Sequence, residues 1–207
     1  MKEKTCGGSV KATHSLFQEE DGGSIPTSPL KLRVYLCKFK DIRHIFEQYH
    51  YKGGNMGGGI SFCLALMFEY KIVGGCVVGL PRHADKYKNS VELRRMACLD
   101  EMPKNTESYF LSKVIWYIKK NTDFETVISY SDLSVGHVGT IYKAANFKEI
   151  GRTAPSVHVF WKGKRYHPRS LTIDRPYSYK LREAIKTGEA TKEIGKPKII
   201  YAYKLNR

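Results

Sequence analysis

The chain has 207 residues, of which 42% are hydrophobic, and this is enough for one sizeable core. No apolar run approaches the roughly 20 residues that cross a bilayer, and no apolar stretch follows the basic N-terminus, so we expect no membrane partner, no secretory signal and a cytoplasmic location. The formal net charge of +15 excludes an acidic protein and favours a polyanionic partner.

The first elements predicted in chain order are a tail, a strand and a helix. Residues 1–29 are polar and rich in Gly, Ser and Thr, which predicts a flexible N-terminal tail. Alternating apolar residues predict a strand over 30–37, and apolar residues at helical spacing predict a helix over 40–49. The glycine-rich residues 52–59 follow, and they fit either a mobile loop beside a site or a plain connector.

The rest of the chain predicts a hairpin followed by alternating helices and strands. Strands are expected at 61–68, 71–80, 90–99, 126–131, 148–152, 156–161 and 198–205. Helices are expected from Asn105 to about residue 118, from Gly136 and His137 to residue 147, and over 179–186. This order predicts an α/β fold with a mixed, mostly antiparallel central sheet flanked by helices. We expect one domain over 30–207, in which residues 168–207 form a basic C-terminal helix and strand.

Positive charge is concentrated in the last third of the chain. Residues 148–207 hold fifteen Lys and Arg against five Asp and Glu, a net charge of +10, which leaves +5 for the first 147 residues. A surplus gathered in one segment can attract a polyanion such as DNA. A solvated basic surface without a partner is the plainer interpretation.

The cysteines indicate neither disulfides nor a zinc site. Five cysteines, Cys6, Cys37, Cys63, Cys76 and Cys98, are scattered without a CxxC pair. Cys63 and Cys76 lie in apolar runs, where cysteine usually acts as a small buried hydrophobe. A reducing compartment therefore fits better than a disulfide framework.

The segment 92–112 combines a strand, a turn and the start of a helix. The N–H groups and the positive dipole end at a helix N-terminus attract phosphates. Lys104 adds a cation there, and Asn105, Thr106 and Ser108 add hydrogen-bond donors. An ordinary capped helix, with Asn105 as the N-cap, would explain the same residues.

A second segment, 127–151, places two residues suited to proton transfer after a buried strand. Asp132 ends that strand, a favoured position for sites in α/β sheets, and it can orient or deprotonate an amine. Tyr142, on the following helix, can donate a proton to a leaving thiolate. The plainer interpretation is that Asp132 caps the next segment and Tyr142 packs in the core.

The order of elements resembles the GNAT N-acetyltransferase superfamily. Residues 141–147 resemble its Tyr-x-x-x-Gly-Phe segment, with Asn146 in place of the glycine. The resemblance implies a GNAT-like fold in which a helix N-terminus binds the CoA pyrophosphate and a later helix carries a tyrosine near the CoA sulfur. It implies that acetyl-CoA or a related acyl donor binds at Lys104, Asn105, Thr106 and Ser108.

A narrower set of motifs resembles the Mom proteins of bacteriophages over roughly residues 30–170. These motifs are His50-Tyr51, Glu92-Leu-x-Arg95, Pro103-Lys-Asn-Thr-Glu-Ser108, Ser129-Tyr-Ser-Asp132, Gly136-His-x-Gly139 and Ile141-Tyr-Lys-Ala144. The resemblance implies a DNA-modifying transferase, acting in the host cytoplasm, that converts adenine in double-stranded phage DNA to an N6-carbamoylmethyl form and so protects it from restriction. The catalytic residues that it implies are His50, Tyr51, Arg95, Ser108, Asp132 and Tyr142.

Two other functions stay open at this point. One is a GNAT-type N-acetyltransferase acting on a protein or a small amine, and the other is a non-catalytic, basic DNA-binding module. Tyr51, Tyr109 and Tyr130 can stack a base or pack in the core. His50 and Asp132 can share an iron or zinc ion only if the fold brings them together. The oligomeric state is left open, a homodimer included.

Overall fold

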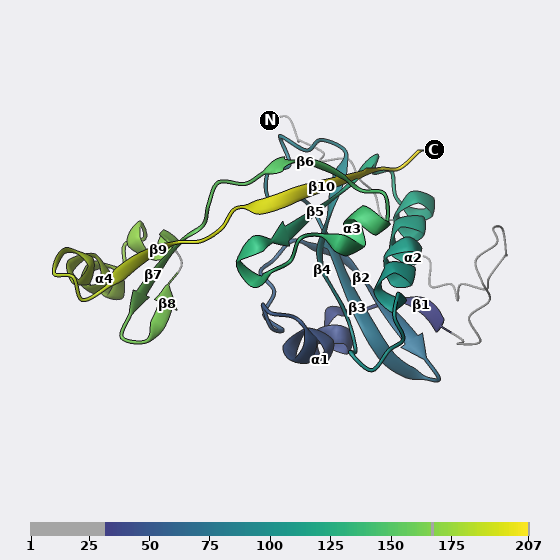
Figure 1. The fold of residues 1–207 in the computed structure, drawn as a ribbon, viewed down its shortest axis with the longest axis horizontal. Helices are drawn as coiled ribbons and strands as arrows, with labels where there is room; N and C mark the ends of the chain where they lie inside the picture. Colours follow the sequence, from purple (N-terminus) through teal and green to yellow (C-terminus); the bar gives the residue numbers. More distant parts are fainter. Residues whose placement is uncertain (1–31, 167, 207) are drawn as a thin grey trace, which may run out of the picture. The chain divides into compact units, whose positions relative to one another are not determined.

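The structure, a computed structural model, describes residues 32–166 and 168–206, so the tail predicted at residues 1–29 lies outside the described residues. The chain divides into two compact units (Figure 1). The first unit contains residues 32–130, 139–149 and 201–206, and the second contains 131–138, 150–166 and 168–200. The single domain expected over 30–207 stays a prediction, because a compact unit is defined by its contacts and not by an ability to fold alone.

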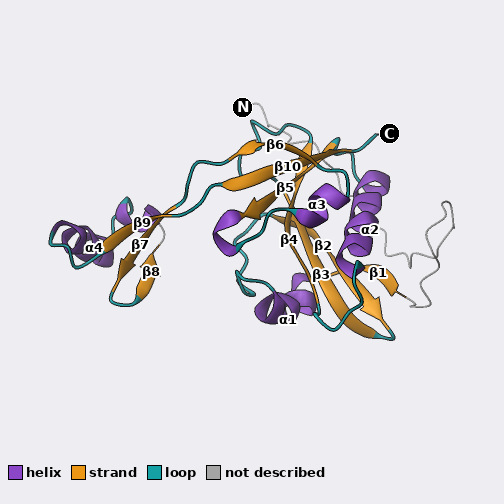
Figure 2. Ribbon diagram, viewed as in Figure 1, coloured by secondary structure: helices purple, strands orange, loops and turns teal. Residues whose placement is uncertain are grey.

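A seven-stranded sheet holds most of the first unit together (Figures 1 and 2). Its strands, in spatial order, are β1 (Leu32–Cys37), β2 (Ile60–Phe68), β3 (Lys71–Gly79), β4 (Ser90–Cys98), β5 (Thr126–Asp132), β10 (Lys198–Lys204) and β6 (Lys148–Arg152). Strands β1 to β4 pair antiparallel, and β4 pairs parallel with β5. The predicted class, a mixed and mostly antiparallel sheet flanked by helices, is confirmed.

Two helices cover opposite faces of strands β2 to β4. Helix α1 (Phe39–Tyr49) buries an apolar stripe against one face. The residues packed together there are Ile42, Ile45 and Phe46 of α1 with Cys63, Ala65, Val77 and Ala97 of the sheet. Successive residues of a strand point to opposite faces, so Phe62 points to the other face. There its ring lies 5.3 Å from the ring of Tyr117 in helix α2 (Thr106–Asn121).

The interpretation of the central cysteines as small buried hydrophobes is confirmed. Cys63, Cys76 and Cys98 are buried within strands β2, β3 and β4. Burial raises the pKa of Cys63 to about 11 and that of Cys98 to about 12. Their thiols therefore stay protonated at neutral pH and act as packing groups rather than nucleophiles.

Strand β4 carries an irregularity at the centre of the sheet. Val77 pairs with Arg95 and Val78 with Leu93, so Arg94 is an extra residue, a β-bulge. The parallel pairs with β5 run only from Ser90 to Glu92. Beyond them the Ser129 hydroxyl donates a hydrogen bond to the Leu93 carbonyl at 3.2 Å. The residues of β4 from Leu93 to Cys98 therefore lie beyond those that pair with β5.

The helix predicted to open at Gly136 and His137 begins later, and that prediction is wrong. A 3-10 turn covers Leu133–Val135, and helix α3 (Thr140–Ala144) begins only after Gly139. Gly136 and Gly139 have φ of +77° and +75°, a left-handed conformation that a continuous right-handed helix excludes. A side chain at Gly139 would overlap the ring of Tyr201 in β10, so glycine allows α3 to approach that strand.

The second unit has its own small sheet and core. Strand β7 (Val157–Trp161) lies between β8 (Lys164–Tyr166) and β9 (Thr191–Ile194), and helix α4 (Pro176–Lys186) supplies Leu181 and Ala184 to the core around Val159. The prediction placed the start of α4 at residue 179, but Pro176 begins the helix, because proline suits the first helical turn. Strands β8 and β9 were not predicted, because they are short and largely exposed.

Among the described residues, none of the helices combines the length and apolar content needed to cross a bilayer.

Candidate functional site

A cavity of about 420 Å³ lies at the N-terminal end of α2. It is lined by the segment that joins β4 to α2 and by one side of α3. The four residues predicted to bind a cofactor, Lys104, Asn105, Thr106 and Ser108, all line it, together with Thr140, Ile141 and Ala144. Its volume is in the range typical of small-molecule sites. The structure thus brings the predicted cofactor residues together, and their role in binding stays a prediction.

Asn105 begins α2 in a different way from that expected. It occupies the N-cap position with φ +71°, a left-handed conformation that Asn tolerates, and among the described residues its side chain makes no cap hydrogen bond. The Thr106 hydroxyl instead donates to the Pro103 carbonyl at 2.8 Å, which closes the preceding turn. The main-chain N–H of Thr106 donates to the same carbonyl at 3.2 Å. The positive dipole end of α2 is suited to an anion in the cavity.

Tyr142 of α3 is held among aromatic rings. Its ring lies 5.4 Å from the ring of Tyr201 and 5.4 Å from that of Phe147. Burial raises the pKa of Tyr142 to about 12, against a hydrogen bond with Ser129 that lowers it. The phenol is therefore protonated at neutral pH, as a proton donor must be.

Two arginines of β4 hold the glycine-rich loop. Arg95 is buried, and its guanidinium donates hydrogen bonds to the carbonyls of Gly53 and of Asn55, the latter at 2.6 Å. Arg94, the bulge residue, donates to the Gly58 carbonyl at 2.6 Å. Burial lowers the pKa of Arg95 from its ordinary value, although the guanidinium stays charged at neutral pH. The loop is thus tied to β4 at both of its ends, and the predicted catalytic Arg95 contacts its backbone.

His50 and Tyr51 form a stacked pair at the end of α1. Their ring centroids are 4.8 Å apart with an interplanar angle of 20°. The main-chain N–H of Lys52 donates to Nδ1 of His50 at 3.2 Å, which places the proton of a neutral imidazole on Nε2. The ammonium of Lys52 lies 5.2 Å from the centroid of the Tyr51 ring. Tyr51 also acts electrostatically on Arg95, so these predicted residues gather around the same loop.

Asp132, the remaining predicted catalytic residue, belongs to the second unit. Its Oδ1 accepts a hydrogen bond from the main-chain N–H of Ser134 at 3.1 Å, and its Oδ2 pairs with the Lys198 ammonium at 3.2 Å. The carboxylate therefore caps the 3-10 turn that follows β5, which is the plainer of the two roles that the sequence allowed. Its catalytic role stays a prediction.

Glu92 of β4 was not among the predicted site residues. Among the described residues, none donates a hydrogen bond to its buried Oε2 atom. Burial raises the pKa of Glu92, whereas Arg94, Arg82 and Lys52 lower it by their positive charge. The signal in the sequence was an acidic residue within the strand segment 90–99, because a carboxylate there must be paired, protonated or functional.

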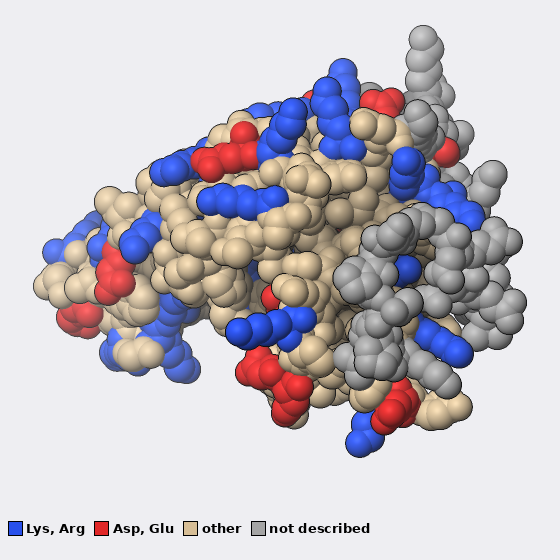
Figure 3. All heavy atoms as spheres, turned by 45° about the vertical axis from the view of Figure 1, so that its right-hand side comes forward, with Lys and Arg blue, Asp and Glu red and all other residues tan. Residues whose placement is uncertain are grey.

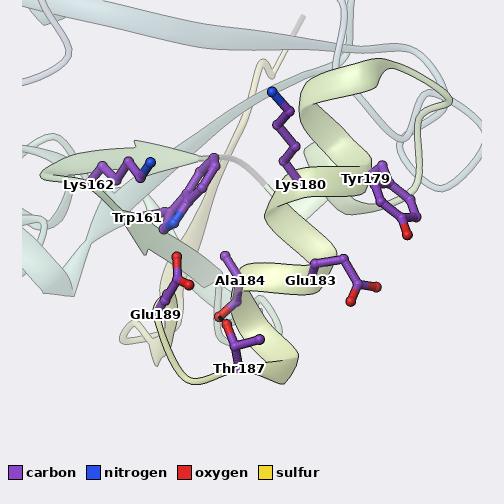
Figure 4. Close-up of a pocket in the computed structure, with 8 residues that line it drawn as sticks. All are labelled: Trp161, Lys162, Tyr179, Lys180, Glu183, Ala184, Thr187 and Glu189. Atoms are coloured by element: carbon purple, nitrogen blue, oxygen red, sulfur yellow. Dashed lines mark hydrogen bonds between the residues drawn. The ribbon is translucent and has the colours of Figure 1, made fainter.

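A second hollow, of about 250 Å³, lies within the second unit. Figure 4 shows Trp161 and Lys162 facing helix α4, which contributes Tyr179 and Lys180. The Lys162 ammonium lies 4.9 Å from the Trp161 ring centroid. Aromatic rings beside lysines suit contacts with nucleic acid, and two glutamates, Glu183 and Glu189, line the same hollow.

The sequence left open whether the protein holds an iron or zinc ion. Within residues 32–166 and 168–206, no group of three or more His, Cys, Asp or Glu side chains is placed to hold an ion.

Tyr109, one of the three tyrosines considered for base stacking, donates its hydroxyl to the Leu32 carbonyl at 3.3 Å and so helps to attach α2 to β1.

The sequence profile of the Mom protein family matches residues 31–206. The chain belongs to the Mom family. This match covers the sheet, the cavity at α2, the glycine-rich loop and the second unit, and it confirms the resemblance seen in the motifs. No curated protein matches the chain in sequence.

Solved structures of acetyltransferases share the fold of this Mom family member. The ribosomal-protein-S18-alanine N-acetyltransferase of Escherichia coli superposes with a TM-score of 0.52 and 12% identity, over 85% of this chain and 95% of that one. A Bacillus subtilis acetyltransferase in complex with CoA gives a TM-score of 0.53 and 12% identity, over 85% of this chain and 100% of that one. An N-acetyltransferase from Staphylococcus aureus Mu50 gives a TM-score of 0.53 and 12% identity, over 85% of this chain and 99% of that one. The predicted GNAT-like fold is confirmed.

Proposed function

We propose that the protein is a DNA-modifying transferase that uses an acyl-CoA-type donor to modify the exocyclic N6 amine of adenine. The proposed product is the N6-carbamoylmethyl adenine that the Mom resemblance implies, which would protect phage DNA from restriction in the host cytoplasm. The observation that carries the proposal is the cavity at the start of α2, lined by the four predicted cofactor residues within a Mom family chain. The donor, the DNA partner and the catalytic roles are parts of this proposal.

The residues around the cavity fit the phosphate end of such a donor. Lys104 supplies a cation, and the start of α2, which the Asn105 side chain does not cap, supplies the positive end of the helix dipole. The B. subtilis neighbour contains CoA. From Leu93 to Cys98, β4 lies outside its parallel register with β5, so its backbone is suited to hold an extended arm by main-chain hydrogen bonds. These groups would hold the donor along one edge of β4.

The chemistry of transfer assigns separate tasks to the predicted residues. Attack of the N6 amine on the carbonyl carbon of a bound acyl thioester would form a C–N bond, break the C–S bond and release a thiolate, which gives an N6-acyl adenine. The carbamoylmethyl product would need the amine to attack a methylene carbon instead, in a donor that carries the carbamoyl nitrogen and releases the same kind of thiolate. Tyr142, kept protonated by burial, holds the proton for that thiolate. Arg95 contributes through the loop 53–58, whose backbone it fixes. Asp132 has the proposed task of orienting the amine.

Positive charge supports DNA as the substrate. The second unit holds twelve Lys and Arg against five Asp and Glu. Lys and Arg side chains lie along much of the face drawn in Figure 3, with fewer Asp and Glu among them. The basic residues of the second unit, Lys162 and Lys180 included, would contact phosphates, while an enzyme acting on a base amine takes that base out of the stack.

Nucleoside mass spectrometry tests the proposal. The purified protein is incubated with double-stranded DNA and acetyl-CoA, with and without an extract of the phage-infected host, and the DNA is digested to nucleosides. A modified deoxyadenosine supports the proposal. Its mass separates an N6-acetyl group, joined through a carbonyl carbon, from an N6-carbamoylmethyl group, joined through a methylene carbon.

The same samples separate the two alternative functions. Unmodified DNA together with an acetylated protein or polyamine amine would show a GNAT-type N-acetyltransferase with another substrate. Unmodified DNA that the protein nevertheless binds with strong salt dependence would show a basic DNA-binding module. Either result would overturn the proposed function.

A further inference from the structure

Glu92 occupies a position where the sheet changes its pairing. It forms the last parallel pair of β4 with β5, opposite Ile128, and it lies opposite Gly79 on its other side in β3. Arg94, two residues further along β4, is the bulge residue. Its side chain covers Gly79, because a Cβ added at Gly79 would lie 3.0 Å from the Arg94 Cδ. Glu92 therefore lies at the one point of β4 where regular pairing on both edges ends.

The carboxylate of Glu92 is incompletely satisfied within the described part of the chain. The main-chain N–H of Arg82 donates one hydrogen bond to it. Its other oxygen, Oε2, is buried and receives none from the residues 32–166 and 168–206. A buried carboxylate oxygen without a donor is unfavourable, so its presence calls for a donor that arrives with a ligand.

Aromatic side chains stand next to this carboxylate. Residues two apart on a strand share a face, so Tyr130 of β5 lies on the same face as Ile128, the pairing partner of Glu92. Glu92 acts electrostatically on Tyr130, whose hydroxyl hydrogen-bonds with that of Tyr87. A half-buried tyrosine ring beside a hydrogen-bond acceptor suits a flat ring that carries an amine.

Cations complete the surroundings. Arg82 and Lys52 are exposed, and both act electrostatically on Glu92. The guanidinium of Arg94 is bonded to the Gly58 carbonyl, and the ammonium of Lys52 lies over the Tyr51 ring. The exposed side chains of Arg82 and Lys52 carry positive charge suited to a phosphate. The amine acceptor and the aromatic surface match the amine and the ring of a base, and the cations match the phosphate of a nucleotide.

We infer that Oε2 of Glu92 accepts a hydrogen bond from the exocyclic amine of the base to be modified, in a nucleotide site bounded by Tyr130, Arg82 and Lys52. The inference rests on the proposed function for the identity of the amine, because adenine carries its N–H donors on N6. It adds the acceptor side of the reaction to the donor side at α2, and it gives Glu92 a role in selecting a base that bears an amine.

A binding experiment tests this contact without any chemistry. Two single-stranded oligodeoxynucleotides are compared, one with a single adenine among thymines and one with purine, which lacks the 6-amino group, in its place. The full chain should bind the adenine oligonucleotide about tenfold more tightly or better, the size expected for a hydrogen bond to a charged group. In Glu92→Ala the two oligonucleotides should bind equally, whereas the control Glu149→Gln, an exposed carboxylate on β6, should keep the preference.

The outcomes also separate this inference from the proposed function. Binding of acetyl-CoA to Glu92→Ala, measured by calorimetry, should equal that of the parent and so shows that the variant is folded. A parent without preference for adenine, or a Glu92→Ala variant that keeps it, overturns the inference even if adenine in DNA is modified. A Glu92-dependent preference in a protein that yields no modified adenine supports the amine site and refutes only the proposed reaction.

Discussion

The ring of Tyr142 lies 5.4 Å from the ring of Tyr201, and this contact joins the short helix α3 to β10. The same helix lines the cavity at the start of α2 through Thr140, Ile141 and Ala144. Packing of the ring therefore sets the position of Tyr142. Removal of its hydroxyl leaves this ring packing in place. This makes the hydroxyl separable from the fold in an experiment.

Replacing Tyr142 by phenylalanine should lower kcat about 100-fold, while the unfolding temperature falls only by the amount expected from losing the hydroxyl's hydrogen bond with Ser129, about 1 kcal/mol of stability. The ring contacts with Tyr201 and Phe147 are kept, while the proton on the hydroxyl is lost. Tyr203→Phe is the matched control, because Tyr203 packs against Phe147 in the same aromatic cluster. Equal kcat values for the two variants would refute the assignment of Tyr142 as the proton donor.

Gly139→Ala should destabilise the protein more than Gly136→Ala. Both glycines have a positive φ, +75° and +77°, so alanine is strained at either position by about 1 kcal/mol. Only at Gly139 does the new methyl group meet the Tyr201 ring, since nothing lies within 4 Å of such a group at Gly136. The additional overpacking should cost about 1–3 kcal/mol more in the free energy of unfolding, measured in urea. Equal losses at the two positions would show that α3 does not depend on this close approach.

The same two glycines show where the sequence was sufficient and where it was not. The strands β2 and β3 were predicted almost to their ends, because long apolar runs separated by a polar turn have few alternatives. The start of α3 was misplaced, since a glycine can stand inside a helix or end it, and only the ring of Tyr201 shows which applies here. Tertiary contact decided the outcome, and no local pattern records it.

The candidate site was predicted in its residue types more than in its arrangement. Lys104, Asn105, Thr106 and Ser108 come together because they are close in sequence at the start of one helix. Glu92 was missed because the sequence does not show where the pairing of β4 with β5 ends or which carboxylate oxygen lacks a donor. Both facts depend on strand register, which is set by residues far away in the chain.

Glu92→Gln should raise the free energy of unfolding at neutral pH by about 1 kcal/mol while it weakens activity. Burial raises the pKa of Glu92 in the folded protein above its ordinary value of 4.5, so folding favours the protonated form. The contribution of Glu92 to stability is therefore fully present below pH 4.5 and is lost as the pH rises through the folded-state pKa. Urea unfolding over this pH range should show nearly equal stabilities in acid and a growing advantage of the variant toward neutral pH. A variant less stable than the parent at neutral pH would mean that Glu92 has a structural role.

The double variant Lys162→Glu/Lys180→Glu should weaken binding to duplex DNA. Both lysines line the hollow of the second unit beside Trp161, as Figure 4 shows, and the proposal assigns them to phosphate contacts. Loss of two such contacts lowers the slope of log Kd against log salt by roughly 2, because each phosphate contact in duplex DNA contributes about 0.9. Fluorescence anisotropy with a labelled duplex over a series of salt concentrations measures this slope.

The double variant Lys119→Glu/Lys120→Glu provides the control for this measurement. These two lysines lie in the last turn of α2, in the first unit, and their reversal changes the net charge by the same amount. If DNA binding depended only on the net charge of +15, both double variants would lose affinity equally. A lower salt slope for Lys162→Glu/Lys180→Glu alone assigns the phosphate contacts to the second unit. Equal slopes would instead mean that its surplus of twelve basic over five acidic residues acts only as a diffuse field.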